Sequence, residues 1–329
     1  MSFGSMPIAN GFIEKKDVSK EYFFKLNPSF CNNCFTFQIE DQPEASIMFH
    51  ENYAFFTRQS KAMQKHFGEF ARWIDNNFMN SRDPFIIELG SNDGVLLEHF
   101  ACKDIKHLGI EPSANVAIEA EKYGVKSLVK FFSEIESKNI HEVYGKADVI
   151  TASNVMCHIP NLNDVARGID LLLKEDGVLI FEDPYLGDMI SKTSYDQIYD
   201  EHVYIFSALS VKSIFSKVNL EIIDLIPQKT HGGSMRYVLG RLGKHPISDR
   251  VAKIIKDEEN QGLDKLDTFI NFKISCEKSK SDLVKILKDE RKNGKKIAAY
   301  GATSKSTTIL NYCSIGADLI EYICDTTPI

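Results

Sequence analysis

The feature that most constrains this chain is a regular alternation of apolar and amphipathic segments between residues 84 and 240. The short apolar runs predict buried strands, and the longer segments between them have apolar residues at helical spacing. The predicted strands are Phe85–Leu89, His107–Glu111, Asp148–Ser153, Gly177–Asp183 and two later ones near 220–226 and 235–241. The predicted helices between them include 94–102, 113–123 and 163–174. Such alternation is typical of an α/β fold, in which a parallel sheet carries helices on both faces.

Two flanking regions differ from this central part, so the sequence predicts three domains, at 1–80, 81–240 and 241–329. The first combines loops with an amphipathic helix near 62–74. The last begins with a Lys- and Glu-rich stretch of helical periodicity at 249–293, which indicates long helices with solvated faces. A strand, a helix and a last strand follow, at 296–300, from about Ser304 and at 319–324.

The overall composition excludes several classes of protein. The 329 residues carry a net charge of −7, so no broad basic surface exists for duplex nucleic acid. No apolar run approaches the roughly 18 residues that a membrane span requires. The N-terminus has neither the basic nor the apolar region of a secretory signal. We therefore expect a cytoplasmic protein, monomeric or homodimeric, that binds neither nucleic acid nor membrane.

The cysteines do not form a disulfide pattern. Seven of them are spread along the chain, and an odd, scattered set argues against a disulfide framework. Only Cys31 and Cys34 have the spacing of metal ligands. One such pair supplies two thiolates, whereas a closed structural zinc site takes four ligands. Taken alone, the pair is compatible with a zinc site and with two ordinary loop cysteines.

The strongest motif lies where the first predicted strand ends, in Ile86-Ile-Glu-Leu-Gly90-Ser-Asn-Asp-Gly94. Ligands of open α/β sheets bind at this edge, and glycine lets the backbone approach a ligand closely. The G-x-x-x-G spacing is neither that of dinucleotide-binding folds nor that of a P-loop. The second strand ends at Glu111, whose carboxylate can accept hydrogen bonds from a ribose diol, and the third ends before Asn154. Each piece alone is also compatible with an ordinary turn.

Together, at the ends of successive strands, these three pieces resemble the class I methyltransferases that use S-adenosylmethionine (SAM). The resemblance implies a Rossmann-like class I methyltransferase domain with SAM as cofactor. It assigns cofactor binding to Glu88, Gly90, Asn92, Gly94, Glu111, Pro112, Phe131, Phe132 and Asn154.

Further motifs concern the methyl acceptor. The pattern Y-x-E-H at 199–202, H-G-G-S-x-R at 231–236 and the segment 300–313 together resemble the nucleotide-sugar C-methyltransferases. These enzymes methylate a carbon beside the ketone of a nucleotide-linked keto-deoxysugar. The resemblance implies a small zinc-binding N-terminal domain, a SAM-binding domain and a C-terminal α/β domain that helps to hold a nucleotide-diphosphate sugar.

The chain departs from this family pattern at both ends. The family has two N-terminal cysteine pairs, whereas this chain has only Cys31 and Cys34. The family's C-terminal domain also continues for several strands beyond Ile329. We therefore expect a chain shortened at both ends, with an incomplete C-terminal domain. The zinc that the resemblance implies for Cys31 and Cys34 then lacks two ligands.

Methylation of carbon requires a carbanion equivalent, which a ketone supplies as its enolate. Histidine suits removal of the α-proton, since its pKa lies near working pH, and the resemblance favours His202 as this base. Glu201 beside it is expected to orient the imidazole ring. Tyr199, Tyr53 and His158 are expected to donate hydrogen bonds to the enolate oxygen. The residues predicted to bind the substrate are Ser234, Arg236, Lys305 and Ser306.

Each of these residues also has a purely structural interpretation. His202 is compatible with a capping role, Tyr53 with core packing, and Lys305 with a helix N-terminus, where amides and a cation also suit a diphosphate.

Two other functions remain open. A SAM-dependent O- or N-methyltransferase of a small metabolite would not need the extra Tyr and His residues. A SAM-binding scaffold that docks a partner through its CxxC region would not need to retain Tyr199 and His202.

Overall fold

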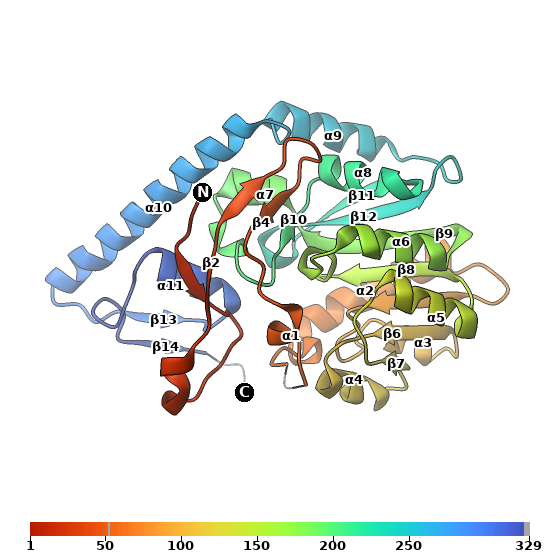
Figure 1. The fold of residues 1–329 in the computed structure, drawn as a ribbon, viewed down its shortest axis with the longest axis horizontal. Coiled ribbons are helices and arrows are strands. Elements are labelled where there is room, and N and C mark those ends of the chain that lie inside the picture. The colour runs from red at the N-terminus through yellow and green to blue at the C-terminus, as the bar shows by residue number, and fades with distance from the viewer. Residues whose placement is uncertain (52, 326–329) are drawn as a thin grey trace.

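The computed structural model describes residues 1–51 and 53–325, and its central element is a seven-stranded sheet (Figure 1). The strand order is β11-β12-β9-β8-β5-β6-β7. Strand β12 pairs antiparallel with both β11 and β9, and all other neighbouring strands of this sheet pair in parallel. The strands are β5 (Phe85–Leu89), β6 (Lys106–Ile110), β7 (Ser127–Leu128), β8 (Ala147–Ser153), β9 (Leu173–Pro184), β11 (Leu220–Gln228) and β12 (Ser234–Arg241). The predicted α/β, Rossmann-like fold is confirmed.

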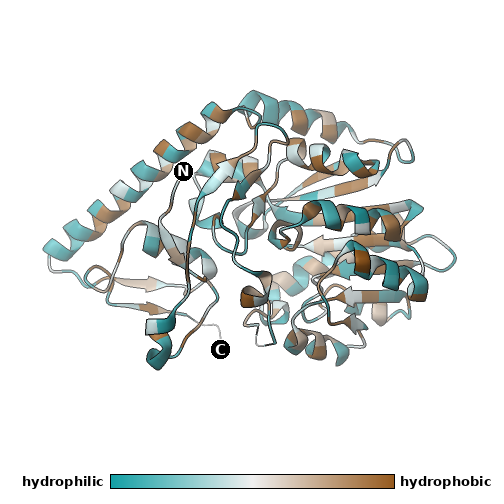
Figure 2. Cartoon of the chain, viewed as in Figure 1, coloured by the Kyte–Doolittle hydropathy of each residue, from teal (hydrophilic) through white to brown (hydrophobic). Residues whose placement is uncertain are grey.

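Helices cover both faces of this sheet, because successive side chains of a strand point to opposite sides. Ile87 belongs to the core beneath α5, α6 and α8, whereas its neighbour Ile86 belongs to the core beneath α2, α3 and α4. Figure 2 shows the strands largely in brown and the outward faces of many helices in teal. The helices are α2 (Lys61–Phe78), α3 (Glu98–Ala101), α4 (Ala114–Glu121), α5 (Glu134–Tyr144), α6 (Leu162–Leu172) and α8 (Ala208–Phe215).

Three differences between the observed and the predicted elements of the central domain affect its topology or its helices. The helix predicted at 94–102 is reduced to α3, because turns occupy most of the chain between Gly94 and Glu98. The sheet is not wholly parallel, since β11 and β12 form a hairpin. The edge strand β7 is not predicted, because two residues are too few to show an alternating pattern.

The N-terminal region forms small antiparallel sheets that reach back to the central domain. Strand β1 (Ser5–Pro7) pairs with β2 (Phe23–Lys25), and β3 (Pro28–Phe30) pairs with β4 (Phe37–Ile39). Strand β4 also pairs with β10 (Tyr204–Ile205), which begins two residues after His202. The N-terminal region therefore holds the backbone that follows His202. The short helices near this region are α1 (Ala45–Met48) and the 3₁₀ helices η1 (Lys15–Lys20) and η2 (Thr57–Gln59).

The C-terminal region begins with two helices, α9 (Asp249–Gln261) and α10 (Leu266–Lys292). Figure 1 shows α10 running along one edge of the molecule toward a small terminal unit. That unit consists of β13 (Ala298–Tyr300), α11 (Ser304–Tyr312) and β14 (Tyr322–Cys324), and the two strands pair in parallel. Within the described part of the chain, no helix is both long and apolar enough to cross a membrane.

A separate hydrophobic core joins both ends of the chain to residues 186–205. Phe37 of β4 stacks on Phe269 of α10, with ring centroids 5.7 Å apart. Phe3 and Tyr312 each contact Tyr195, which belongs to the 3₁₀ helix η4 (Tyr195–Gln197). Helix α7 (Leu186–Lys192) contributes to the same core. The segment 186–205 is therefore enclosed by the N-terminal strands and by α10 and α11.

Glu258 of α9 anchors the C-terminal region to the central domain. Its side chain is fully buried. One carboxylate oxygen accepts the N–H of Ala208 and the hydroxyl of Tyr185, and the other accepts the N–H of Leu209. These two amides belong to the unpaired first turn of α8, so Glu258 caps that helix from another element.

We predict that Glu258→Ala lowers the free energy of unfolding by about 3 kcal/mol, because it leaves one buried and two partly buried donors without an acceptor. Glu259→Ala is the matched control, since Glu259 is exposed on the same helix. Urea denaturation at pH 7 measures both changes. Equal stability of the two variants would show that Glu258 does not act as a cap.

Candidate active site

A cavity of about 1030 Å³ lies at the carboxyl ends of β5, β6 and β8. Its lining comes from three parts of the chain: the strand ends, the residues around 199–202, and segments near residues 10 and 302–305. Ligand sites in proteins have volumes of about 300–1,000 Å³, so this cavity is large enough for a cofactor and a substrate together. The carboxyl edge of the sheet is where the sequence predicts the ligand.

Gly90 and Gly94 of the glycine motif have different roles. Gly90 has φ 61° and lines the cavity, and a Cβ there would lie 2.3 Å from Val155 Cγ2. Gly94 has φ 74° and is not among the residues that line the cavity. A Cβ on Gly94 would meet Val125 Cγ2 at 2.9 Å. Gly94 therefore allows close packing of a turn, and its assignment as a cofactor contact stays a prediction.

Glu111 is held by the glycine loop and by the start of α4. Its Oε2 accepts the N–H of Asn92 at 2.9 Å, and its Oε1 accepts the N–H of Ser113 at 2.9 Å. Burial raises the pKa of the Glu111 carboxyl. The Asn92 side chain accepts from the N–H of Thr57 and donates to the carbonyl of Phe55, so it attaches residues 55–57 to the rim of the cavity.

The polar groups of this edge fit the SAM that the resemblance implies. Three polar atoms of cavity-lining residues at this edge are buried and have no hydrogen-bond partner among the described residues: Oε2 of Glu88, Oγ of Ser91 and Oγ of Ser153. Buried polar atoms without partners are uncommon in proteins and point to a missing ligand. SAM offers both an amine and ribose hydroxyls as donors. The other predicted cofactor residues that line the cavity are Gly90, Asn92, Glu111, Pro112, Phe131, Phe132 and Asn154.

Tyr199 and His202 form a hydrogen-bonded pair in the wall of the cavity. The hydroxyl of Tyr199 lies 2.9 Å from Nε2 of His202, and Nδ1 of His202 lies 2.6 Å from the carbonyl oxygen of Gln197. A carbonyl can only accept, so Nδ1 carries the proton and Nε2 accepts from Tyr199. Burial lowers the pKa of His202 well below its ordinary value. His202 is therefore a neutral imidazole whose basic nitrogen contacts Tyr199.

His158 and Tyr53 lie beside this pair. The His158 ring lies 5.3 Å from that of His202 and 5.6 Å from that of Phe49. Burial lowers the pKa of His158 to about 3, and its Nε2 has no hydrogen-bond partner among the described residues. Tyr53 lines the same cavity, and burial together with Glu201 raises its pKa. The structure thus brings together all five predicted catalytic residues.

The expected contact between Glu201 and the ring of His202 is not observed. The Glu201 carboxyl instead accepts from Asn10 Nδ2 at 2.6 Å. Both ring nitrogens of His202 are occupied by Tyr199 and Gln197. The ring is therefore oriented by a backbone carbonyl, which the sequence pattern does not identify because a carbonyl has no residue signature.

Of the predicted substrate contacts, only Lys305 lines the cavity. Arg236 is buried in an ion pair with Glu182, and its guanidinium lies 3.9 Å from the centre of the Phe70 ring. Ser234 donates to the carbonyl of Thr230, and Ser306 donates to the carbonyl of Thr303. Arg236, Ser234 and Ser306 thus make contacts within the protein and are not among the residues that line the cavity, so their assignment as substrate contacts stays a prediction.

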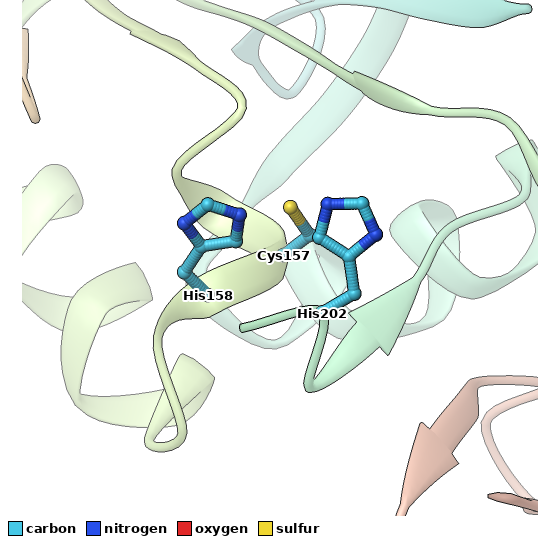
Figure 3. A group of neighbouring side chains, drawn as sticks. All are labelled: Cys157, His158 and His202. Atoms are coloured by element: carbon cyan, nitrogen blue, oxygen red, sulfur yellow. The ribbon is translucent and has the colours of Figure 1, made fainter. Parts of the chain in front are cut away.

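Cys157, His158 and His202 are the one group of three candidate metal ligands in the described residues. Their ligand atoms lie within 4.8 Å of one another, and Figure 3 shows the thiol beside the two rings. A thiolate and two imidazoles would suit zinc. However, both nitrogens of His202 are hydrogen-bonded, and burial together with Asp183 raises the pKa of the Cys157 thiol. We therefore do not assign a metal centre to this group.

The predicted zinc ligands, Cys31 and Cys34, lie in the turn between β3 and β4. No other His, Cys, Asp or Glu of residues 1–51 and 53–325 joins them in a group of three. Two thiols do not complete a tetrahedral zinc site, so this pair alone does not fit a structural zinc ion.

The structure adds site residues that the sequence patterns do not single out. Asn10 contacts Glu201, the carbonyl of Gln197 orients His202, and Phe49 stacks on His158. His231 has φ 53°, and its Nε2 lies 3.3 Å from the side-chain amide of Asn154. Its position within the motif at 231–236 is a signal that could have identified it.

Three family models match the chain in succession. The "Putative zinc binding domain" matches residues 1–49, the methyltransferase domain matches residues 63–225, and the C-methyltransferase C-terminal domain matches residues 229–329. The order of these matches follows the order of the predicted domains.

A curated relative matches nearly the whole chain. C-methyltransferase NovU of Streptomyces niveus is 26% identical over 329 residues, which are 99% of this chain and 78% of that protein.

Solved structures resemble only part of the chain. Magnesium protoporphyrin IX methyltransferase (ChlM) from Synechocystis PCC 6803, with bound SAM, has a TM-score of 0.39 and 15% identity over 54% of this chain and 79% of its own. A SAM-dependent methyltransferase from Anabaena variabilis has a TM-score of 0.42 and 16% identity over 55% of this chain and 86% of its own. Both structures resemble too small a part of this chain to support a conclusion about its function.

We predict that Glu111→Ala weakens SAM binding by roughly 1–3 kcal/mol, as for the loss of hydrogen bonds to a charged group. Isothermal titration calorimetry measures the change, with Glu121→Ala, an exposed carboxylate at the end of α4, as the control. Unchanged affinity in Glu111→Ala would refute the assignment of this residue to the ribose.

Proposed function

Since the chain belongs to the SAM-dependent C-methyltransferases, we propose that it methylates the carbon beside the ketone of a nucleotide-linked keto-deoxysugar through an enolate. The observation that carries this proposal is the buried pair of Tyr199 and His202 in the wall of the cavity. A neutral imidazole hydrogen-bonded to a phenol is suited to accept a proton from a weak carbon acid.

A carbon acceptor sets the chemical requirements of the site. A C–H group is not nucleophilic until its proton is removed, and an adjacent ketone makes the removal feasible by delocalising the charge onto oxygen. The site must therefore contain a base and also donors that stabilise the oxyanion. An O- or N-methyltransferase needs the base alone, so the cluster of Tyr53, His158 and Tyr199 favours the carbon acceptor.

We propose that the proton leaves through Tyr199 to His202. Nε2 of His202 is already in contact with the Tyr199 hydroxyl, so a substrate proton is best accepted by the phenol oxygen. The phenol proton passes at the same time to Nε2, which leaves a neutral tyrosine and an imidazolium. Nδ1 keeps its proton throughout, because it continues to donate to Gln197. His202 remains the base, as the resemblance suggests, but acts through Tyr199.

Two groups beside the pair are suited to stabilise the enolate oxygen. The Nε2 of His158 has no hydrogen-bond partner in the part of the chain that the structure describes, and the lowered pKa keeps the ring neutral at pH 7. The phenol of Tyr53 stays protonated because burial raises its pKa. Both therefore remain neutral hydrogen-bond donors at working pH, and fixed donors around an oxyanion contribute several kcal/mol to catalysis.

The remaining parts of the cavity suit the donor and the nucleotide. SAM, when bound at the Gly90–Glu111 edge, supplies the electrophilic methyl group. At the opposite end, Lys305 lies in the first turn of α11 and lines the cavity. Amides of a helix N-terminus together with a lysine suit a diphosphate. Burial lowers the pKa of Lys305, which an anionic ligand would counteract.

The proposal predicts proton removal without methylation. With S-adenosylhomocysteine bound, the α-hydrogen of a 4-keto-6-deoxy nucleotide sugar should exchange with deuterium from heavy water, as followed by mass spectrometry. His202→Asn should slow this exchange by about 10²–10⁴-fold, as for loss of a general base. Tyr199→Phe should slow it to a similar extent, and the double variant little further, because the two residues act as a unit.

Tyr195→Phe is the matched control, because this tyrosine lies in the same segment but its hydroxyl contacts Cys313. Its exchange rate should equal that of the unmodified protein. Absence of enzyme-dependent exchange would refute the enolate mechanism. Fast exchange in Tyr199→Phe with slow exchange in His202→Asn would show that His202 takes the proton directly.

A further inference from the structure

Asn10 connects two parts of the cavity that are distant in the sequence. Its side-chain Nδ2 donates to Oε1 of Glu201 at 2.6 Å, and its Oδ1 accepts from the Ser304 hydroxyl at 3.0 Å. The adjacent N–H of Ala9 donates to Oδ1 of Asp200 at 3.1 Å. Residues 9 and 10 therefore connect the buried carboxyl groups of Asp200 and Glu201 to the first turn of α11.

The surroundings of Glu201 disfavour the ionised form of its carboxyl group. Its side chain is almost fully buried, and Asp200 is a second buried carboxyl beside it. The other titratable groups that interact with it are Tyr53, Tyr199 and Cys157. Burial and Asp200 raise the pKa of Glu201 to about 8, whereas the hydrogen bond from Asn10 lowers it. At pH 7 Glu201 is therefore mostly a neutral carboxylic acid.

The Asn10 contact determines which oxygen of that acid carries the proton. An amide N–H only donates, so Oε1 must be the acceptor, and the proton of the neutral acid lies on Oε2. Glu201 lines the cavity, and Asn10 is the side chain that hydrogen-bonds to its Oε1.

We propose that Asn10 is a positioning residue that keeps Oε1 of Glu201 as an acceptor, so that Oε2 donates its O–H toward the substrate oxygen. Through its hydrogen bond with Ser304, Asn10 also connects Glu201 to α11. The role at the substrate rests on the proposed function, whereas the link between Asn10 and Glu201 does not. A buried carboxylic acid that stays protonated is an effective oxyanion donor.

Asparagine suits this position because its amide donates and accepts at once. Alanine removes both hydrogen bonds, and aspartate keeps the shape but replaces the donor with a carboxylate that repels Glu201. Both Asn10→Ala and Asn10→Asp should therefore raise the pKa of Glu201. The comparison of the two variants separates loss of packing from loss of the donor.

The first measurement needs no substrate. Infrared difference spectra of the full chain, titrated with pH, report the protonated carboxyl band that Glu201→Gln removes. In both Asn10 variants this band should persist to higher pH than in the unmodified protein. Asn32→Ala, which changes an exposed asparagine of the N-terminal region, should not move the midpoint. An unchanged midpoint in both Asn10 variants would overturn the proposal.

The second measurement is the deuterium exchange of the keto-sugar with S-adenosylhomocysteine bound. Both Asn10 variants should slow it by about 10- to 100-fold, as expected for loss of one hydrogen bond to an ionisable group, with SAM affinity unchanged. Asn32→Ala, an exposed asparagine of the N-terminal region, is the control. Variants that are merely less stable to heat, with a normal rate and a normal midpoint, would show a structural role and overturn the proposal. A shifted midpoint without exchange in the unmodified protein would support the Asn10–Glu201 link and refute the proposed function.

Discussion

The arrangement of the site depends on the hydrophobic core that encloses residues 186–205. Side chains of β1, β2 and β4 meet those of α10 and α11 around Leu186, Tyr195 and Ile198. The hydroxyl of Thr308 in α11 also donates to the carbonyl of Ile198 at 2.7 Å. The segment between Ile198 and β10 carries Tyr199, Glu201 and His202, so both ends of the chain hold it in place. Each such apolar side chain contributes about 1.5–3 kcal/mol on burial, which makes the enclosure collectively strong.

This enclosure also determines the protonation states of the site. Burial lowers the pKa values of His158 and His202 and raises those of Glu201 and Tyr199. All four groups are therefore neutral near pH 7, and polar contacts decide which atoms donate and which accept. The Gln197 carbonyl assigns the proton of His202 to Nδ1, and Asn10 assigns the acceptor oxygen of Glu201. Hydrogen bonds from neutral groups then direct proton movement inside the cavity.

The sequence predicts the central domain well because its signals are local. Buried strands such as β5 and β8 appear as short apolar runs, and the carboxyl ends of parallel strands meet at one edge, which brings Gly90, Glu111 and Asn154 together. Prediction is poorer where a residue's role depends on a distant partner. Arg236 has the character of a substrate ligand, yet it pairs with Glu182 across neighbouring strands. Gly94 fits the spacing of the motif, but the absence of a side chain at this position lets the turn pack against Val125.

By itself, the sequence determined the α/β class and the ligand-binding edge of the sheet, because periodicity and strand order are local properties of the chain. The five candidate catalytic residues followed from the resemblance of their motifs to the nucleotide-sugar C-methyltransferases. Only the tertiary structure decided what each of those residues contacts. Asn10 lies 191 positions from Glu201 and 294 from Ser304, yet it bonds to both. Such contacts form when apolar side chains from both ends of the chain pack against each other and exclude water. No local sequence pattern predicts which polar atoms this packing brings into contact.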